Sequence, residues 1–306
     1  LATTALTSTL SLDTKTIRGL NGAGRVTLDA GAATRCFDLG LSAKSIWTRV
    51  TLQNLTLRRG WSDLGGAIRV AGMPGYGKLV LERCLLNANR ATTSGGAIHV
   101  VGAGLTLVHC VLSGNEAPQG GAISLLNLAP VGSVSYSFAS IHQSRLAYNA
   151  ATGVNASSGQ GGAVCAYASY FAMTQTRLDH NMAQRHGGGL AILSPSAYYP
   201  PAVGEGTVME FNSALERGGA VYSENAPFVA TAAKFIGNLA GSNGFTGEGG
   251  AVFLAHPASV TTSAMGHSSR IAQFMASQFR LNQAGSRGGA VAIADASPLL
   301  TNCAFT

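Results

Sequence analysis

The stretch LERCLLNANRATTSGGAI at residues 81–98 decides the fold of this chain, because its two short motifs recur along most of the sequence. The first motif is Leu86 followed three residues later by Asn89, and the second is Gly-Gly-Ala-Ile at 95–98. Recurrence at spacings of 25 to 41 residues is the signature of a repeat architecture. Copies of the second motif, ending in Ile or Val, lie at 65–68, 95–98, 120–123, 161–164, 218–221, 249–252 and 288–291, with Gly-Gly-Gly-Leu at 187–190.

An asparagine stands ahead of almost every glycine pair, three residues after a large apolar side chain. Asparagine amides can hydrogen-bond to one another and to turn backbone, so this column predicts a structural ladder between successive repeats. The glycine pair predicts a sharp corner, where positive φ or close backbone approach excludes other residues. The first repeat departs from the pattern, because Gly60 stands in place of the asparagine, three residues after Leu57. The predicted ladder consists of Asn89, Asn115, Asn149, Asn181, Asn212, Asn238 and Asn282.

Within each repeat, apolar residues alternate with period two, which is typical of strands rather than helices. Cys84 and Leu86 share one face before the asparagine, and Ile98 and Val100 share one after the glycines. Each repeat therefore offers two short strands with one apolar face, which is too little to fold alone. Stacking one repeat per coil, with like strands in parallel, buries a continuous core. The sequence predicts an all-β protein, a parallel β-helix (β-solenoid) of about ten coils.

The strand rhythm also extends upstream of the repeats. We expect residues 1–50 to form N-terminal coils that lack the repeat motif, and residues 51–306 to form the repeat coils of the same β-helix. The last residues, 300–306, read as the first strand of one more repeat, cut off before its asparagine. This pattern predicts that the chain is a segment of a longer solenoid.

The pairing of Gly-Gly-Ala-[Ile/Leu/Val] with a preceding Phe-x-x-Asn resembles the repeats of the polymorphic outer-membrane proteins of chlamydiae. The resemblance covers about residues 51–306, although this chain has Leu or Met at most Phe positions. It implies a right-handed β-helix of the pectin-lyase-like kind, exposed on a cell surface and used in adhesion or as a scaffold. An extracellular or cell-surface location is therefore expected.

Composition excludes several classes of protein. Charged residues make up only 11% of the 306 residues and hydrophobic residues 46%, the reverse of a disordered chain. No run of 18 apolar residues occurs, so no direct membrane insertion by a helix is expected. The net charge is +7, but the 20 Lys and Arg residues form no cluster of the kind that binds nucleic acid. The positive charge suggests a weak attraction to acidic glycans or anionic surfaces, with ordinary solvated surface charge as the alternative.

The carboxylates give no recognisable catalytic or metal site. Acid–base cleavage of a glycosidic bond needs two carboxylates that converge at about 5–10 Å, yet no two of the 13 acidic residues are adjacent in the sequence. A calcium-binding loop with spaced Asp and Asn residues is also absent from the sequence. We therefore expect no catalytic, cofactor-binding or metal-binding residues and no cofactor. The alternative is a polysaccharide lyase or glycoside hydrolase whose catalytic coil is unrecognised or lies outside this segment.

Cysteines and sequons suggest possible covalent features. Cys84 and Cys110 occupy the same inward position in successive coils, so we expect two buried free thiols, with a disulfide as the alternative. Asn54 and Asn155 begin N-x-[Ser/Thr] sequons and are candidates for glycosylation. Asn155 lies in an expanded loop at 150–160, and alternation predicts that Asn54 points outward from a strand.

Outward positions of the strand after the glycines suggest a contact face. Tyr222 and Phe253 follow one another in this column, and Tyr198 and Tyr199 add aromatic bulk from a nearby insertion. These residues predict an interaction face, with coverage of the face by a loop as the alternative. Taken with what the resemblance implies, the patterns predict a non-catalytic extracellular structural or adhesive module of a surface protein, in a fibril or appendage. Its expected partners are copies of itself, another surface or fibril protein, or glycans.

Overall fold

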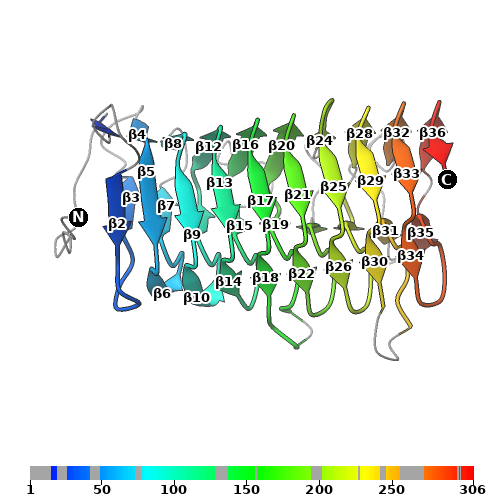
Figure 1. Cartoon of the computed structure of the whole chain (residues 1–306), viewed down its shortest axis with the longest axis horizontal. Helices are drawn as coiled ribbons and strands as arrows, with labels where there is room; N and C mark the ends of the chain where they lie inside the picture. Colours follow the sequence, from blue (N-terminus) through cyan, green and yellow to red (C-terminus); the bar gives the residue numbers. More distant parts are fainter. Residues whose placement is uncertain are drawn as a thin grey trace, which may run out of the picture.

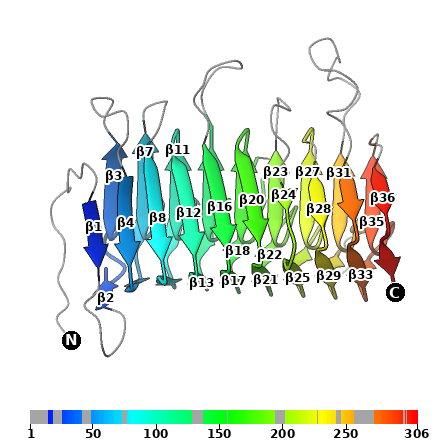
Figure 2. The same ribbon diagram turned by 90° about the horizontal axis from the view of Figure 1, so that it is seen from above.

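The computed structural model describes residues 15–18, 26–41, 49–72, 77–127, 137–155, 157–193, 202–226, 228–241, 246–255, 272–294, 296 and 298–306. Within these ranges every regular element is a β-strand, and the strands form four parallel sheets along the long axis of the molecule (Figures 1 and 2). We name the four sheets A to D and give their strands below. In a complete coil the chain contributes one strand to each sheet, in the order A, B, D and C. The fold is therefore a parallel β-helix, as the sequence predicts.

The strands of each sheet come from successive coils. Sheet A contains β1 (Lys15–Arg18), β4 (Arg49–Gln53), β8 (Lys78–Glu82), β12 (Gly104–Val108), β16 (Phe138–His142), β20 (Tyr170–Thr174), β24 (Ala202–Val203), β28 (Val229–Thr231), β32 (Gln273–Met275) and β36 (Leu299–Thr301). Sheet B contains β2 (Val26–Asp29), β5 (Leu55–Arg58), β9 (Leu85–Asn87), β13 (Val111–Ser113), β17 (Arg145–Ala147), β21 (Arg177–Asp179), β25 (Val208–Glu210), β29 (Lys234–Ile236), β33 (Gln278–Arg280) and β37 (Ala304–Phe305). Sheet C contains β3 (Phe37–Leu41), β7 (Ile68–Gly72), β11 (Ile98–Val101), β15 (Ile123–Leu126), β19 (Val164–Tyr167), β23 (Leu190–Leu193), β27 (Val221–Glu224), β31 (Val252–Ala255) and β35 (Val291–Ala294). Sheet D contains β6 (Trp61–Leu64), β10 (Arg90–Ser94), β14 (Glu116–Ala117), β18 (Ala150–Ala151), β22 (Met182–Ala183), β26 (Ser213–Ala214), β30 (Leu239–Ala240) and β34 (Gln283–Ala284).

The expectation of two strands per repeat was incomplete. Sheets B and C are the two predicted strands, whereas sheets A and D were not predicted from the repeat. Sheets A and B each have ten strands, in agreement with about ten coils. The strands β1, β2 and β3 from the first 50 residues pair with β4, β5 and β7, so they continue the same sheets.

Each corner between sheets D and C requires two glycines for two different reasons. Gly187 has a φ of +66°, in the left-handed region that favours glycine. Gly188 has no room for a side chain, because a Cβ atom there would lie 2.3 Å from the carbonyl oxygens of Ser213 and Gly219 in the next coil. The third position, Gly189, is Ala in the other seven copies of the motif. The glycine pair therefore lets successive coils pack directly against one another.

The core is a set of aligned side-chain columns inside the coils. In sheet B, Leu86 pairs with Leu57 and Leu112, and all three side chains are fully buried. The same column continues to Phe235 and Phe279, whose rings stack with centroids 4.8 Å apart. Alternation with period two thus places one large apolar side chain of sheet B inside each coil.

Candidate functional site

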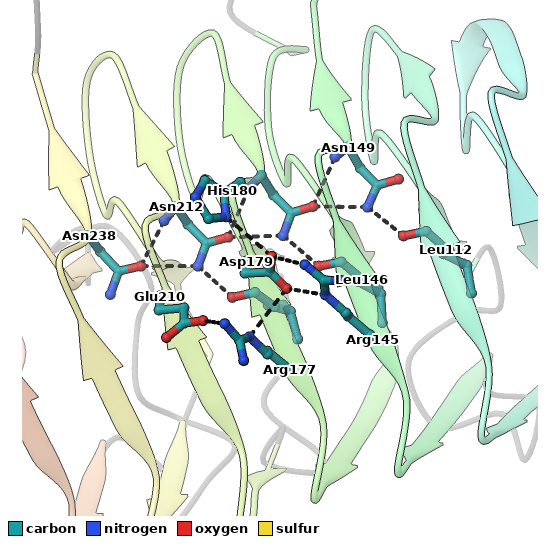
Figure 3. A network of polar contacts seen from close by, with 12 residues as sticks. Leu112, Arg145, Leu146, Asn149, Arg177, Asp179, His180, Glu210, Asn212 and Asn238 are labelled. Carbon is teal, nitrogen blue, oxygen red and sulfur yellow. Dashed lines mark hydrogen bonds and ion pairs between the residues drawn. The ribbon is translucent and has the colours of Figure 1, made fainter.

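The asparagine ladder is a continuous hydrogen-bond network in which each side chain from Asn89 to Asn238 bonds to both neighbouring coils, and Figure 3 shows its middle part. Asn181 donates from Nδ2 to the carbonyl oxygen of Leu146 in the preceding coil, at 2.9 Å, and to Oδ1 of Asn212 in the next coil, at 2.9 Å. Its Oδ1 accepts from the backbone N of Asn149 at 3.0 Å and from Nδ2 of Asn149 at 2.9 Å. Both donors and both lone pairs are therefore used, as a buried amide requires.

This pattern repeats through the predicted ladder, which the hydrogen bonds confirm. The first repeat lacks an asparagine, and there the backbone N of Gly60 donates to Oδ1 of Asn89 at 2.9 Å. The amide pairs are Asn89–Asn115, Asn115–Asn149, Asn149–Asn181, Asn181–Asn212, Asn212–Asn238 and Asn238–Asn282. The ladder is a structural element that fixes the register of successive coils.

A second ladder of small polar side chains lies at the corner between sheets A and B. Ser144 Oγ donates to the carbonyl oxygen of His142 at 2.8 Å and accepts from the backbone N of Cys110 at 3.0 Å. Thr176 Oγ1 donates to the carbonyl oxygen of Thr174 at 2.9 Å. The sequence shows only that the residue at this inward position is small. The structure adds a reason, because hydroxyl and thiol groups at this position form hydrogen bonds with backbone groups of the corner.

Charged side chains gather on the outer face of sheet B in the middle of the rod (Figure 3). Arg145 binds Asp179 of the next coil with two hydrogen bonds, Nε to Oδ1 at 2.8 Å and Nη2 to Oδ2 at 2.6 Å. Arg177 forms an ion pair with Glu210 of the following coil and lies 3.5 Å from Asp179. His180 Nδ1 lies 3.2 Å from Oδ2 of Asp179. The network is a chain of ion pairs that joins three coils.

The electrostatics of this network favour a structural role for its carboxylates. The Asp179 side chain is fully buried, and burial raises its pKa, but the Arg145 and His180 hydrogen bonds and the charges of Arg145 and Arg177 lower the pKa below its ordinary value. A general acid in glycoside cleavage needs a raised pKa instead. Asp179 and Glu210 are register partners on adjacent strands, yet both carboxylates are neutralised by arginine.

Sequence reasoning missed this cluster, because adjacency was sought along the chain. Asp179 and Glu210 each follow the large inward residue of their repeat, Leu178 and Met209 respectively. That shared position was the available signal. Once strands are in register, residues at the same position in successive repeats become neighbours.

Further ion pairs between coils follow the same pattern in the described part of the chain. In each pair an arginine of one coil contacts a carboxylate of an adjacent coil, which places opposite charges directly side by side. These pairs are Arg58–Asp29, Arg90–Glu116, Arg185–Glu216, Arg217–Glu248 and Arg287–Glu248.

The predicted interaction face at Tyr222 and Phe253 needs correction, because both side chains are buried, with exposed fractions of 4% and 2%. The rings stack on each other with centroids 5.9 Å apart. His186 stacks on Tyr222 at 4.5 Å, and the guanidinium of Arg217 lies over Phe253 at 4.8 Å. Side chains from the corner before each glycine pair thus lie over the outward aromatic column. Stacking and cation–π contacts stabilise that arrangement.

Other aromatic side chains are exposed instead. Tyr198 and Tyr199 lie outside the described residues. Tyr148 and Phe211 are 58% and 51% exposed, at the corner that follows sheet B. The His180 ring lies between them, stacked on Tyr148 with ring centroids 4.9 Å apart and tilted against Phe211 with centroids 5.3 Å apart. Each of these three residues directly precedes a ladder asparagine, which is a signal that the sequence analysis did not use.

The two sequons differ in their surroundings. Asn54 lies at the corner between β4 and β5, with a φ of +54°, and is half-buried. The expectation that it lies on a strand was therefore wrong, because the chain turns there. Asn155 is exposed, and its Oδ1 accepts hydrogen bonds from Ser157 Oγ at 3.2 Å and Ser158 Oγ at 2.6 Å. Glycosylation of either residue stays a prediction.

None of the cysteines forms a disulfide in the structure, and this includes Cys84 and Cys110. Cys84 Sγ donates to the carbonyl oxygen of Leu52 at 3.3 Å, and Cys110 Sγ donates to that of Leu81 at 3.3 Å. The neighbouring Cys84 thiol and burial raise the pKa of Cys110 well above its ordinary value. The pair belongs to the corner ladder between sheets A and B.

No cluster of three or more His, Cys, Asp or Glu residues in the described ranges could hold a metal ion. Among the same residues, no helix is long and apolar enough to cross a membrane. No family model, no curated protein and no solved structure matches this chain.

Proposed function

We propose that this chain is a non-catalytic structural or adhesive β-solenoid module of an extracellular surface protein, part of a fibril or appendage. One observation carries the proposal. The polar side chains that could do chemistry on sheet B and at its corners bind the adjacent coils instead. Asn181 uses its full hydrogen-bonding capacity in the ladder, and Asp179 is buried under a bidentate arginine.

The connectivity is also what a display scaffold requires. Segments that join a sheet C strand to the following sheet A strand vary widely in length along the chain. They are short at 102–103 and 168–169 and long at 127–137 and 256–272. In a solenoid, insertions at one corner leave the stacked core unchanged while they alter the contacts that the rod can make. A rigid rod with variable insertions suits adhesion better than a single catalytic centre.

The test combines a cleavage assay with an adhesion assay. The purified chain is incubated with polygalacturonate, alginate and xylan, with and without calcium, and the release of reducing ends and unsaturated uronates is measured. We expect no release. In parallel, beads coated with the chain are scored for clustering with one another and for retention on polysaccharide-coated surfaces, with heat-denatured chain as the control. Product release would favour the alternative of a polysaccharide-cleaving enzyme, and loss of both bead responses would remove the adhesive proposal.

A further inference from the structure

A hollow of about 280 Å³ lies on the outer face of sheet C, over the middle coils. Gln119 and Gln160 line it from the corner before the glycine pair, together with Ser157 of the neighbouring loop. Tyr167 and Leu193 line it from the opposite end of the sheet C strands, where they are register partners on β19 and β23. The volume is just below the range of roughly 300–1,000 Å³ that is typical of small-ligand sites.

The position of the hollow follows from the outward column of sheet C. That column has large side chains at His99 and Tyr222, but small ones at Ser124, Cys165 and Ala191 between them. Over the small residues, the amide of Gln119 reaches down to the sheet, with Nε2 3.3 Å from Cys165 Sγ. At the next large residue, His186 stacks on Tyr222 instead. The change from small to aromatic residues in the column thus bounds the hollow at one end.

The lining carries hydrogen-bonding groups of both kinds. The amides of Gln119 and Gln160 each offer donors and an acceptor. Oδ1 of Asn225 is buried and receives no hydrogen bond within the described part of the chain. Glu224 is held in place by the Tyr222 hydroxyl, which donates to its Oε2 at 3.0 Å. Such groups match a ligand with many hydroxyls, each able both to donate and to accept.

The same lining also selects against negatively charged ligands. Glu224 is the one charged side chain among the described lining residues, and it is negative. An anionic ligand would be repelled there, in spite of the net charge of +7 for the whole chain. The Tyr167 ring, 40% exposed, and the Leu193 side chain add an apolar surface on which the C–H face of a sugar ring can lie.

We infer that this hollow, which we call the sheet C groove, binds a neutral oligosaccharide. The inference rests on the proposed adhesive function and names its ligand class and contact site. Tyr167 provides the stacking surface, and Gln119, Gln160 and Glu224 bind the ring hydroxyls. Acidic glycans, which the net charge alone would suggest, are the wrong class for this groove.

Saturation-transfer NMR and calorimetry with defined tetrasaccharides test the inference. Neutral probes are the tetrasaccharides of β-1,4-linked glucose, xylose and mannose, and the acidic probe is tetragalacturonate. We expect at least one neutral probe to bind, with an affinity that hardly changes between 50 and 500 mM salt, and the acidic probe to bind more weakly. Absence of binding by all neutral probes, or preference for the acidic one, overturns the inference.

Two groove variants and one matched control locate the binding site. Tyr167→Ala removes an exposed ring and should weaken binding by about tenfold, whereas Ser157→Trp should block the groove. Tyr148→Ala removes a tyrosine that is more exposed than Tyr167, 58% against 40%, on a different face and should leave affinity unchanged. Equal effects of Tyr167→Ala and Tyr148→Ala would place the ligand elsewhere. If the Tyr167 variant keeps full binding while coated beads still cluster, the groove assignment fails and the adhesive proposal stands.

Discussion

Replacement of one ladder asparagine by alanine should cost several kcal/mol although the side chain touches no ligand. Asn181→Ala removes four hydrogen bonds, two that the side chain donates to Leu146 and Asn212 and two that it accepts from Asn149. At a net value of about 1 kcal/mol per bond, the loss is about 4 kcal/mol. The loss is not relieved by water, because Asn181 is completely buried.

The size of the stability loss depends on the position of the asparagine in the ladder. Asn89→Ala removes three side-chain bonds, to Gly60, Leu57 and Asn115, and should cost about 3 kcal/mol. Asn87, two residues away in the same coil, is half-buried on the outer face of sheet B. Asn87→Ala is the matched control and should change stability by about 0.5 kcal/mol or less.

Equilibrium unfolding in guanidinium measures the loss of unfolding free energy in each of the three variants. Hydrogen exchange shows which coils are destabilised. Since solenoid stability is a sum over coils and their interfaces, exchange should accelerate most in the coils next to the substituted asparagine. An Asn181→Ala loss below 1 kcal/mol, or an equal loss for Asn87→Ala, would refute the reasoning.

Three further predictions concern other parts of the solenoid. Gly188→Ala should destabilise by about 1–3 kcal/mol, because its Cβ would lie 2.3 Å from two backbone oxygens. Gly189→Ala restores the repeat consensus and should cost less, about 1 kcal/mol or below, because its Cβ would lie 2.9 Å from the carbonyl oxygen of Ala220. Urea unfolding of the two variants measures both losses, and an equal loss would contradict the prediction. Burial lowers the pKa of His99 and His186 from 6.5 to about 4. Between pH 6.5 and pH 4 the unfolded chain therefore binds more protons than the folded chain, and the free energy of unfolding should fall as the pH falls over that range. Urea midpoints that stay constant between these pH values would contradict the prediction. The Cys110 thiol, buried and with a raised pKa, should react with a thiol reagent only after unfolding, and fast reaction in the native state would count against its burial.

The repeat made much of the fold predictable, because its signals are local. Period-two alternation around Leu86 and Ile98 placed sheets B and C, and the glycine and asparagine columns placed two corners. Sheet D was missed because strands such as Met182–Ala183 are too short for any periodicity. Sheet A was missed because it carries no fixed motif and follows connections of variable length, as at Phe138–His142.

The outer surface was less predictable, since its contacts depend on register between distant residues. Tyr222 points outward from the sheet, as alternation indicates, yet His186 of the preceding coil lies over it. Alternation says which face of the strand a side chain occupies. It says nothing of side chains that bend over that face from a corner in another coil.

Most carboxylates discussed above pair with an arginine of an adjacent coil, and Glu224 differs from them. Asp179, Glu210, Glu216 and Glu248 each contact an arginine of an adjacent coil, which neutralises their charge. Glu224 instead accepts a hydrogen bond from a neutral tyrosine hydroxyl of its own strand, and it lines the sheet C groove. A carboxylate without a cationic partner keeps its capacity to accept hydrogen bonds from a ligand. The groove therefore presents polar groups that a ligand can reach, and a neutral polyhydroxylated ligand can donate hydrogen bonds to Glu224 without the repulsion that an anion would meet there.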